Sequence, residues 1–182
     1  MSEDAEKPPR KPPGRPRSSA GPLRRSVLHV DARGRARMVD VGGKGATRRV
    51  AVARGALAMS GQAFEALASG RLAKGDAVAV ARVAGIQAAK KTSEIVPLCH
   101  PLALESVEVD VELDRRSRQA VVTATARITG KTGVEMEALT AVSAACLALY
   151  DMIKAIDRAA SIKEILLVEK SGGRSGAYRR SR

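Results

Sequence analysis

Asp151 and Lys154 are the pair of residues in this 182-residue chain whose types and spacing first suggest acid–base chemistry. Three positions apart on a predicted helix, their side chains share one face. In one interpretation they form a surface salt bridge, which is frequent on helices. In the other, the lysine cation stabilises the carboxylate and both groups exchange protons with a substrate. Spacing alone favours the salt bridge.

The segment IVPLCHPL (95–102) holds Cys99 and His100 between two prolines, Pro97 and Pro101. Prolines stiffen the backbone and extend the residues before them, so this loop presents a thiol and an imidazole in a fixed direction. A ligand contact and a structural turn with a satisfied histidine are both compatible with the spacing. Zinc needs three or four ligands, and His29 is the only other histidine in the sequence, so we expect no metal site.

Two glycine loops carry basic residues, GGKG (42–45) and SGGRSG (171–176). Such loops let backbone N–H groups approach phosphate oxygens, although neither matches the P-loop pattern. The segment KTGVEME (131–137) precedes a long apolar run, and its Thr132 and Glu135 fit a T-x-x-E capping box. That pattern predicts the N-terminus of a helix.

Alternating strand and helix signals predict the elements that hold these residues. Strands are expected at 48–59, 104–113, 120–128 and 162–168, with a hairpin between the second and third. Helices are expected after Ser60, over 76–90 with Asp76 as its cap, and along the apolar positions from Leu139 to Ile156. This order favours an α+β fold, a ferredoxin-like antiparallel sheet with helices packed on one face.

Composition bounds the function. The net charge of +13 suits a nucleic acid or a small polyanion such as a nucleoside triphosphate. One Phe, two Tyr and no Trp leave almost nothing for stacking single-stranded bases, so a nucleic-acid partner is disfavoured. No apolar run approaches the roughly 20 residues that a membrane span needs. We expect no membrane partner, and with no export signal and two cysteines we expect a cytoplasmic protein.

Residues 1–25 form a segment of different composition. They contain six of the eight prolines and a net charge of +4, which leaves +9 on the remainder. We expect a disordered basic tail there and a catalytic α+β domain over 26–182, with its last few residues flexible. The tail could be a basic arm for nucleic acid or a solvated extension, and the second interpretation is favoured.

Six segments, in order from about Val27 to Tyr178, together resemble the MoaC family of cyclic pyranopterin monophosphate synthases. They are MVDV (38–41), KGD (74–76), AGIQAAKKTSEIVPLCHPL (84–102), TGKTGVEMEALTAVS (129–143), YDMIKAID (150–157) and EKSGGRSG (169–176). The resemblance implies conversion of 3′,8-cyclo-7,8-dihydro-GTP to cyclic pyranopterin monophosphate with release of pyrophosphate, in molybdenum cofactor biosynthesis. It implies a lyase without a cofactor. It also implies a homohexamer, a trimer of dimers, with active sites at the dimer interface.

The same resemblance assigns site residues by their motif positions. The catalytic residues would be Asp151, Lys154 and Lys74. Substrate-binding residues would be Leu98, Cys99, His100, Met136 and Glu137, with Glu135, Lys90, Lys170, Arg49 and Asp40 at further pocket positions. The lysines would attract the triphosphate. Asp151 and Lys154 would be suitable general acid/base partners if burial brings their pKa values towards neutrality.

Two features of the chain depart from the family pattern. Arg174 and Ala177 replace a lysine and an aspartate in KSGGKSGD, and Arg keeps the charge but not the geometry of lysine. A nucleic-acid-binding protein and an inactive paralogue are the rival interpretations. A salt-dependent shift in a binding assay would favour the first, and retention of all the matched catalytic positions opposes the second.

Overall fold

The computed structural model of this protein describes residues 33–181. The predicted tail at 1–25 lies outside these residues. Strand β1 (Thr47–Ala58) pairs antiparallel along its whole length with β3 (Gln119–Gly130). β3 also pairs with β2 (Ser106–Asp114), and β1 pairs on its other side with β5 (Leu166–Ser171). Two short strands, β4 (Ser161–Ile162) and β6 (Tyr178–Arg179), extend the sheet beside β1 and β5.

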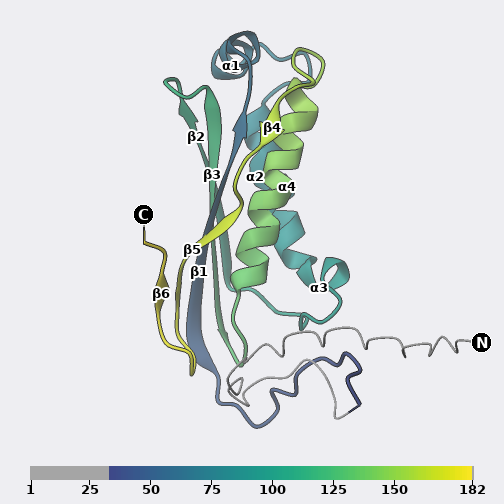
Figure 1. Cartoon of the computed structure of the whole chain (residues 1–182), viewed down its shortest axis with the longest axis vertical. Helices are drawn as coiled ribbons and strands as arrows, with labels where there is room; N and C mark the ends of the chain where they lie inside the picture. The colour runs from purple at the N-terminus through teal and green to yellow at the C-terminus, as the bar shows by residue number, and fades with distance from the viewer. Residues whose placement is uncertain (1–32, 182) are drawn as a thin grey trace, which may run out of the picture.

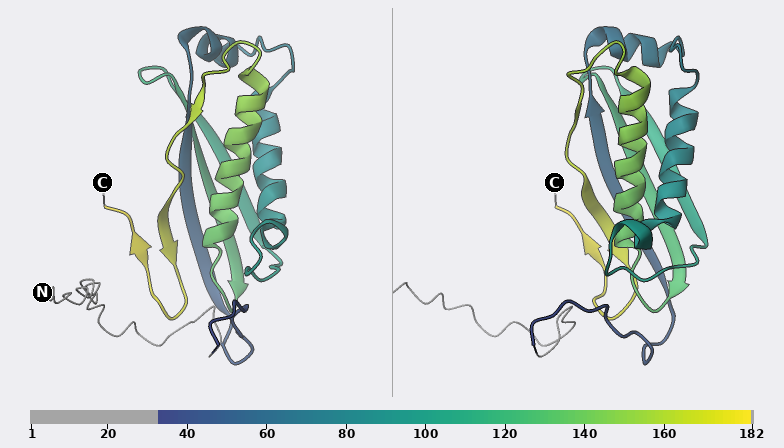
Figure 2. Two further views of the ribbon diagram at one scale, coloured as in Figure 1. Left: turned by 45° about the vertical axis from the view of Figure 1, so that its right-hand side comes forward. Right: turned by 90° about the vertical axis from the view of Figure 1, so that its right-hand side faces the viewer.

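Two long helices cover one face of this sheet, as both views in Figure 2 show. They are α2 (Ala77–Lys90) and α4 (Glu135–Ile153). A short helix, α1 (Gly61–Ala68), lies at the end of the sheet shown at the top of Figure 1, and α3 (Thr92–Ile95) lies at the opposite end. The strand order β2-β3-β1-β5 with α2 and α4 as the two crossovers is the ferredoxin-like arrangement, which confirms the predicted α+β fold.

Small residues allow the helices to approach the sheet closely. The buried side of β1 carries Ala51, Ala53 and Leu57, with Gly55 between them. A methyl group at Gly55 would lie 2.8 Å from Cγ1 of Val142 on α4, so glycine is required at this contact. The long helix α4 therefore lies directly on β1 and its functional ends are held rigidly.

Helix caps account for two of the predicted helix starts. The Ser60 hydroxyl accepts from the N–H of Ala63, and the Asp76 carboxylate accepts from the N–H groups of Val78 and Ala79. The predicted capping box at Thr132 and Glu135 is wrong. Helix α4 begins at Glu135, so Val134 rather than Thr132 occupies its N-cap position, and the apolar valine side chain cannot accept a hydrogen bond. The Glu135 carboxylate instead forms an ion pair with Lys170.

The predicted last strand at 162–168 is divided in the structure. Its first part is β4, and its second part, β5, begins at Leu166 and runs beyond the predicted end to Ser171. The chain between them stays attached to β1 through the N–H of Lys163, which donates to the carbonyl oxygen of Ala56 (2.7 Å). The break lies at Lys163 and Glu164, two charged residues within the predicted strand, and the pairing with β1 defines it.

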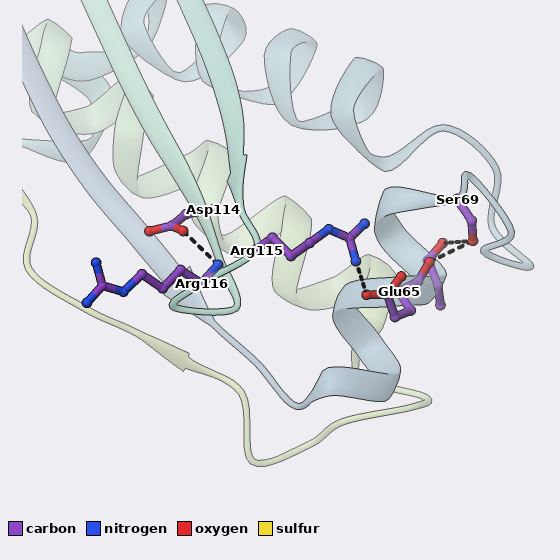
Figure 3. A network of polar contacts seen from close by, with 6 residues as sticks. Glu65, Ser69, Asp114, Arg115 and Arg116 are labelled. Carbon is purple, nitrogen blue, oxygen red and sulfur yellow. Dashed lines mark hydrogen bonds and ion pairs between the residues drawn. The ribbon is translucent and has the colours of Figure 1, made fainter.

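Polar contacts join α1 to the β2–β3 hairpin, as Figure 3 shows. The Arg115 guanidinium forms an ion pair with Glu65 on α1 and lies over the Phe64 ring, 5.6 Å from its centroid. Within the hairpin, the N–H of Arg116 donates to the Asp114 carboxylate (2.9 Å). These contacts close the end of the molecule at which α4 also terminates.

Helix α4 is the one helix within residues 33–181 that is long and apolar enough to cross a membrane, by length and composition alone. Nine of its residues, among them Val142, Cys146 and Leu149, are buried inside the protein. We therefore interpret α4 as the core helix of the fold rather than as a membrane span.

Candidate active site

A cavity of about 250 Å³ lies at the N-terminal end of α4. It brings together two segments that the sequence analysis had singled out separately. Leu98, Cys99 and His100 line it from the proline-flanked loop, and Glu135, Met136 and Glu137 line it from the first turn of α4. Six of the predicted site residues therefore share one cavity.

The segment before β1 supplies another part of the cavity lining, through Val39, Val41 and Lys44. His100 Nε2 donates to the carbonyl oxygen of Val39 (2.8 Å), and Lys131 Nζ donates to that of Gly42 (2.9 Å). These two bonds hold the segment beside the cavity.

The predicted residue Asp40 is exposed, and its carboxylate accepts from the N–H of Gly42 (2.7 Å). It thereby shapes the glycine turn next to the cavity. Val39, Val41, Lys44 and Lys131 were not predicted as site residues, although the glycine loop at 42–45 and the motif that begins at Lys131 were the signals that pointed to them.

Glu137 is the buried carboxyl group of this cavity, with 3% of its surface exposed. Burial raises the pKa of Glu137 to about 7, and the nearby Glu135 carboxylate adds to the increase. Burial also raises the pKa of the Cys99 thiol, with a further contribution from Glu137. At neutral pH Cys99 is therefore a thiol rather than a nucleophilic thiolate, whereas Glu137 can give or take a proton.

Lys170 on β5 connects the cavity to the second glycine loop. Its ammonium group lies 2.8 Å from the Glu135 carboxylate and donates to the Ser175 hydroxyl (2.9 Å). The loop turns at Gly172 and Gly173, both with positive φ, and a side chain at Gly173 would collide with the Arg49 guanidinium. Lys170 and the loop therefore lie beside Glu135 at the edge of the cavity.

Arg49 and Lys90 lie at the same end of the molecule as the cavity, but neither lines it. Arg49 on β1 donates to the carbonyl oxygens of Gly130 (2.9 Å) and Lys131 (3.2 Å), and so holds the chain that enters α4. Lys90 is the exposed last residue of α2.

The predicted catalytic residues form a second cluster at the opposite end of α4. Asp151 lies between two ammonium groups, 2.6 Å from Lys74 Nζ and 2.7 Å from Lys154 Nζ. Lys74 also donates to the backbone carbonyl oxygen of Asp151 (2.9 Å). All three residues were predicted as catalytic, and the structure places Lys74, from the loop between α1 and α2, beside Asp151.

The exposure and the pKa values of this cluster do not match those of a buried acid/base pair. All three side chains are about half exposed, so this chain by itself does not provide the burial on which the acid/base role of Asp151 and Lys154 depends. The hydrogen bonds from Lys154 and Lys74 lower the pKa of Asp151 to about 2, and the bond to Asp151 raises the pKa of Lys154. The two pKa values move apart rather than towards neutrality, which makes Asp151 a permanent anion between two cations.

The two clusters cannot meet within one chain. Glu135 begins α4 and Asp151 lies near its end, sixteen residues later. At 1.5 Å per helical residue this places them about 24 Å apart. One chain therefore carries two separated clusters of predicted site residues, one at each end of α4.

Within residues 33–181, no group of three or more His, Cys, Asp or Glu side chains is arranged to hold a metal ion. The chemistry that this part of the chain offers is that of carboxyl, imidazole and ammonium groups. These groups can bind anions and transfer protons.

Comparison with known proteins identifies the family of this chain. A family model described as the MoaC family matches residues 38–173, most of the described chain and every residue predicted for the site. This chain belongs to the MoaC family. The matched range includes Asp40 at its beginning and Lys170 near its end, so the cavity and the Asp151 cluster are both part of the family's shared region.

Two bacterial relatives of this MoaC-family chain are similar to it over nearly their whole length. A cyclic pyranopterin monophosphate synthase of Novosphingobium aromaticivorans is 56% identical over 153 residues, which are 84% of this chain and 96% of the relative. One of Thermomicrobium roseum is 55% identical over 154 residues, 85% and 93% of the two chains. Molybdenum cofactor biosynthesis protein 1 of Bos taurus is 52% identical over 171 residues, 93% of this chain but 27% of that longer protein.

Proposed function

We propose that this MoaC-family chain is a cyclic pyranopterin monophosphate synthase, a cytoplasmic lyase of molybdenum cofactor biosynthesis. It converts 3′,8-cyclo-7,8-dihydro-GTP to cyclic pyranopterin monophosphate and releases pyrophosphate. The observation that carries the proposal is the cavity in which the loop at 98–100 meets residues 135–137. These two segments match the family's motifs and are far apart in the sequence.

The charge around the cavity suits a nucleoside triphosphate substrate. A triphosphate carries about four negative charges and forms charge-assisted hydrogen bonds with lysine and arginine. Lys44 lines the cavity, and Lys170, Arg49 and Lys131 are held near it by the contacts described above. Lys90 would add positive charge at this end of the molecule, and Asp40 would shape the glycine turn beside the cavity.

We assign the acid/base role to Glu137 rather than to the exposed Asp151. Glu137, with a pKa of about 7, is the general acid/base that serves the rearranging ring system. Asp151 stays ionised and holds Lys74 and Lys154 in place as cations. These ammonium groups stabilise the negative charge that develops as pyrophosphate departs, and they can also donate protons.

A second copy of the chain would complete the site. On α4, Met136, Thr140, Leu147 and Asp151 fall on one side of the helix, and the side chains of Met136 and Leu147 are 38% and 60% exposed. Two α4 helices packed antiparallel about a two-fold axis near Ser143 would place the Met136 end of one beside the partner subunit's Asp151. The acidic residues Glu135 and Glu137 would then face the partner's lysine-rich cluster. We propose this dimer as the unit of a homohexamer.

An activity assay tests the proposed function. The full chain is given 3′,8-cyclo-7,8-dihydro-GTP, generated in place by the upstream radical enzyme, and the product is oxidised to a fluorescent pterin while pyrophosphate is counted. We expect both products in equal amounts. A folded sample that yields neither contradicts the proposal. A yield of pyrophosphate without the pterin also contradicts it, because it indicates simple triphosphate hydrolysis.

A further inference from the structure

Asp157 connects the chain after α4 to the start of α1. One carboxylate oxygen accepts from the N–H of Ser60 (2.7 Å), and the other accepts from the N–H of Ala159 (2.9 Å). The residue is half-buried, and its own N–H donates to the carbonyl oxygen of Ile153 in the last turn of α4. Its side chain therefore fixes the junction of β1 and α1 to the end of the helix that carries Asp151.

The chain from Ser60 to Lys74 is firmly connected. Helix α1 is anchored through Phe64 and Leu67, which are 2% and 5% exposed. After the helix, the N–H of Arg71 donates to the carbonyl oxygen of Ala66 (3.1 Å), and the buried side chain of Leu72 follows. A displacement of α1 at Ser60 would therefore also move Lys74, because the segment between α1 and Lys74 is held by these contacts.

Lys74, at the end of the segment that begins at Ser60, contacts α4 again. Lys74 donates to the carboxylate and to the backbone carbonyl oxygen of Asp151. The contacts form a closed ring, which runs from Asp151 through the end of α4 to Asp157 and Ser60, and then along α1 to Lys74. Tyr150 supports the ring from α4, because its hydroxyl donates to the carbonyl oxygen of Arg158 (3.1 Å).

We propose that Asp157 is a positioning residue, which sets the Lys74 ammonium group against Asp151 by holding α1 to the chain that leaves α4. This inference rests on the proposed catalytic role of Lys74 and Asp151, but the position of Lys74 can be measured without any activity. The side chain of Asp157 bonds to the N–H groups of Ser60 and Ala159, and neither Lys74 nor Asp151 is among its hydrogen-bond or ion-pair partners.

Lysine acetylation provides the direct test. The full-length wild type, Asp157→Asn and Asp157→Ala are treated briefly with an acetylating reagent, and labelling of each lysine is followed by peptide mass spectrometry. Lys90 and Lys163 serve as internal references. We expect the labelling rate of Lys74 to rise several-fold in both variants relative to these references, because its two bonds to Asp151 are weakened.

Asp114→Asn is the matched control. The Asp114 carboxylate accepts from the N–H groups of Arg116 and Ser117 at the same end of the molecule, but both partners lie in the β2–β3 hairpin and the carboxylate itself bonds neither to α1 nor to Lys74. Labelling of Lys74 should be unchanged in this variant. An equal rise at all lysines in Asp157→Asn, or no rise at Lys74, would overturn the proposal, since Asp157 would then be a structural residue only.

Kinetics provide the second readout. We expect kcat of Asp157→Asn to fall by roughly 10- to 100-fold, the cost typical of a misplaced catalytic group, with a smaller change in KM. Asp114→Asn should retain its kcat. Increased Lys74 labelling in a chain without synthase activity would sustain the positioning role and reject the proposed function. Lost activity with unchanged labelling would reject the positioning role.

Discussion

The ammonium group of Lys74 lies 2.6 Å from the carboxylate of Asp151, although 77 positions separate the two residues in the sequence. With Lys154 on the other side of the carboxylate, this contact creates two cations that share one anion. Neutralising the anion leaves two like charges close together, and each then loses its main bonding partner. The arrangement is therefore expected to depend on Asp151.

Replacing Asp151 with asparagine should abolish synthase activity while the protein remains folded. The side chain is about half exposed and its loss removes no core contact, so the melting temperature should change little. Activity should fall by at least about 100-fold, because Lys74 and Lys154 lose the group that positions them.

Asp110→Asn is the control for this experiment, since Asp110 forms an exposed ion pair with Arg82 away from either cluster (3.1 Å). Its activity should match that of the wild type. An active Asp151→Asn enzyme would show that the cluster has no part in catalysis.

Glu137→Gln should change how stability depends on pH. The folded-state pKa of about 7 lies above the ordinary value of 4.5, so the folded protein binds the proton more tightly than the unfolded chain. The wild type is therefore most stable, relative to the variant, below pH 4.5, and it loses this advantage as the pH rises to about 7. The loss should amount to roughly 2 to 3 kcal/mol. Denaturant unfolding of both proteins from pH 4 to 8 measures it, and parallel curves would contradict a raised pKa.

Gly85→Ala should destabilise the helix layer. A methyl group there would lie 2.9 Å from the carbonyl oxygen of Ala141 on α4 and 3.0 Å from Cγ2 of Val109 on β2. The rigid backbone of α4 cannot yield, so we expect a loss of about 1 to 3 kcal/mol in the free energy of unfolding. Gly43→Ala is the control, because nothing lies within 4 Å of the added methyl group. Equal stability of the two variants would show that α2 and α4 are less tightly packed than described.

Gly133→Ala should impair substrate binding more than folding. The added methyl group would fall on the Glu135 carboxylate, which must then leave its ion pair with Lys170. Glu135 is a flexible side chain near the cavity, so the stability cost should be small. We expect KM to rise several-fold and the melting temperature to change little. A lower melting temperature with unchanged KM would assign Gly133 a structural role instead.

The sequence predicted most of the fold because its patterns were local. Val107, Val109 and Val111 alternate with acidic residues, and the structure places that face of β2 towards the core. The Asp76 cap and the helix that follows it are also confirmed. The division of the last strand was missed, because it depends on how residues 161–171 pair with β1, and pairing is a tertiary property.

The sequence predicted which residues belong to the site but not how far apart they lie in the structure. Motifs identified the cavity loop, the first turn of α4 and the Asp151 cluster, yet spacing along the chain gave no distance between them. The capping box fails because the helix begins at Glu135 with Val134 at its N-cap, and Glu135 instead pairs with Lys170, 35 positions away. An acid/base role of Asp151 required burial to bring its pKa towards neutrality, and its partners and exposure move that pKa in the opposite direction.

Mixing two inactive variants tests the central claim most directly. Asp151→Asn and Glu137→Gln each damage one of the two clusters, and each should be inactive alone. If two copies share the site, a mixture whose subunits have exchanged should recover about a quarter of the wild-type activity, because mixed dimers contain one intact site. A mixture that stays inactive after verified exchange would contradict the account and place the whole reaction within one chain.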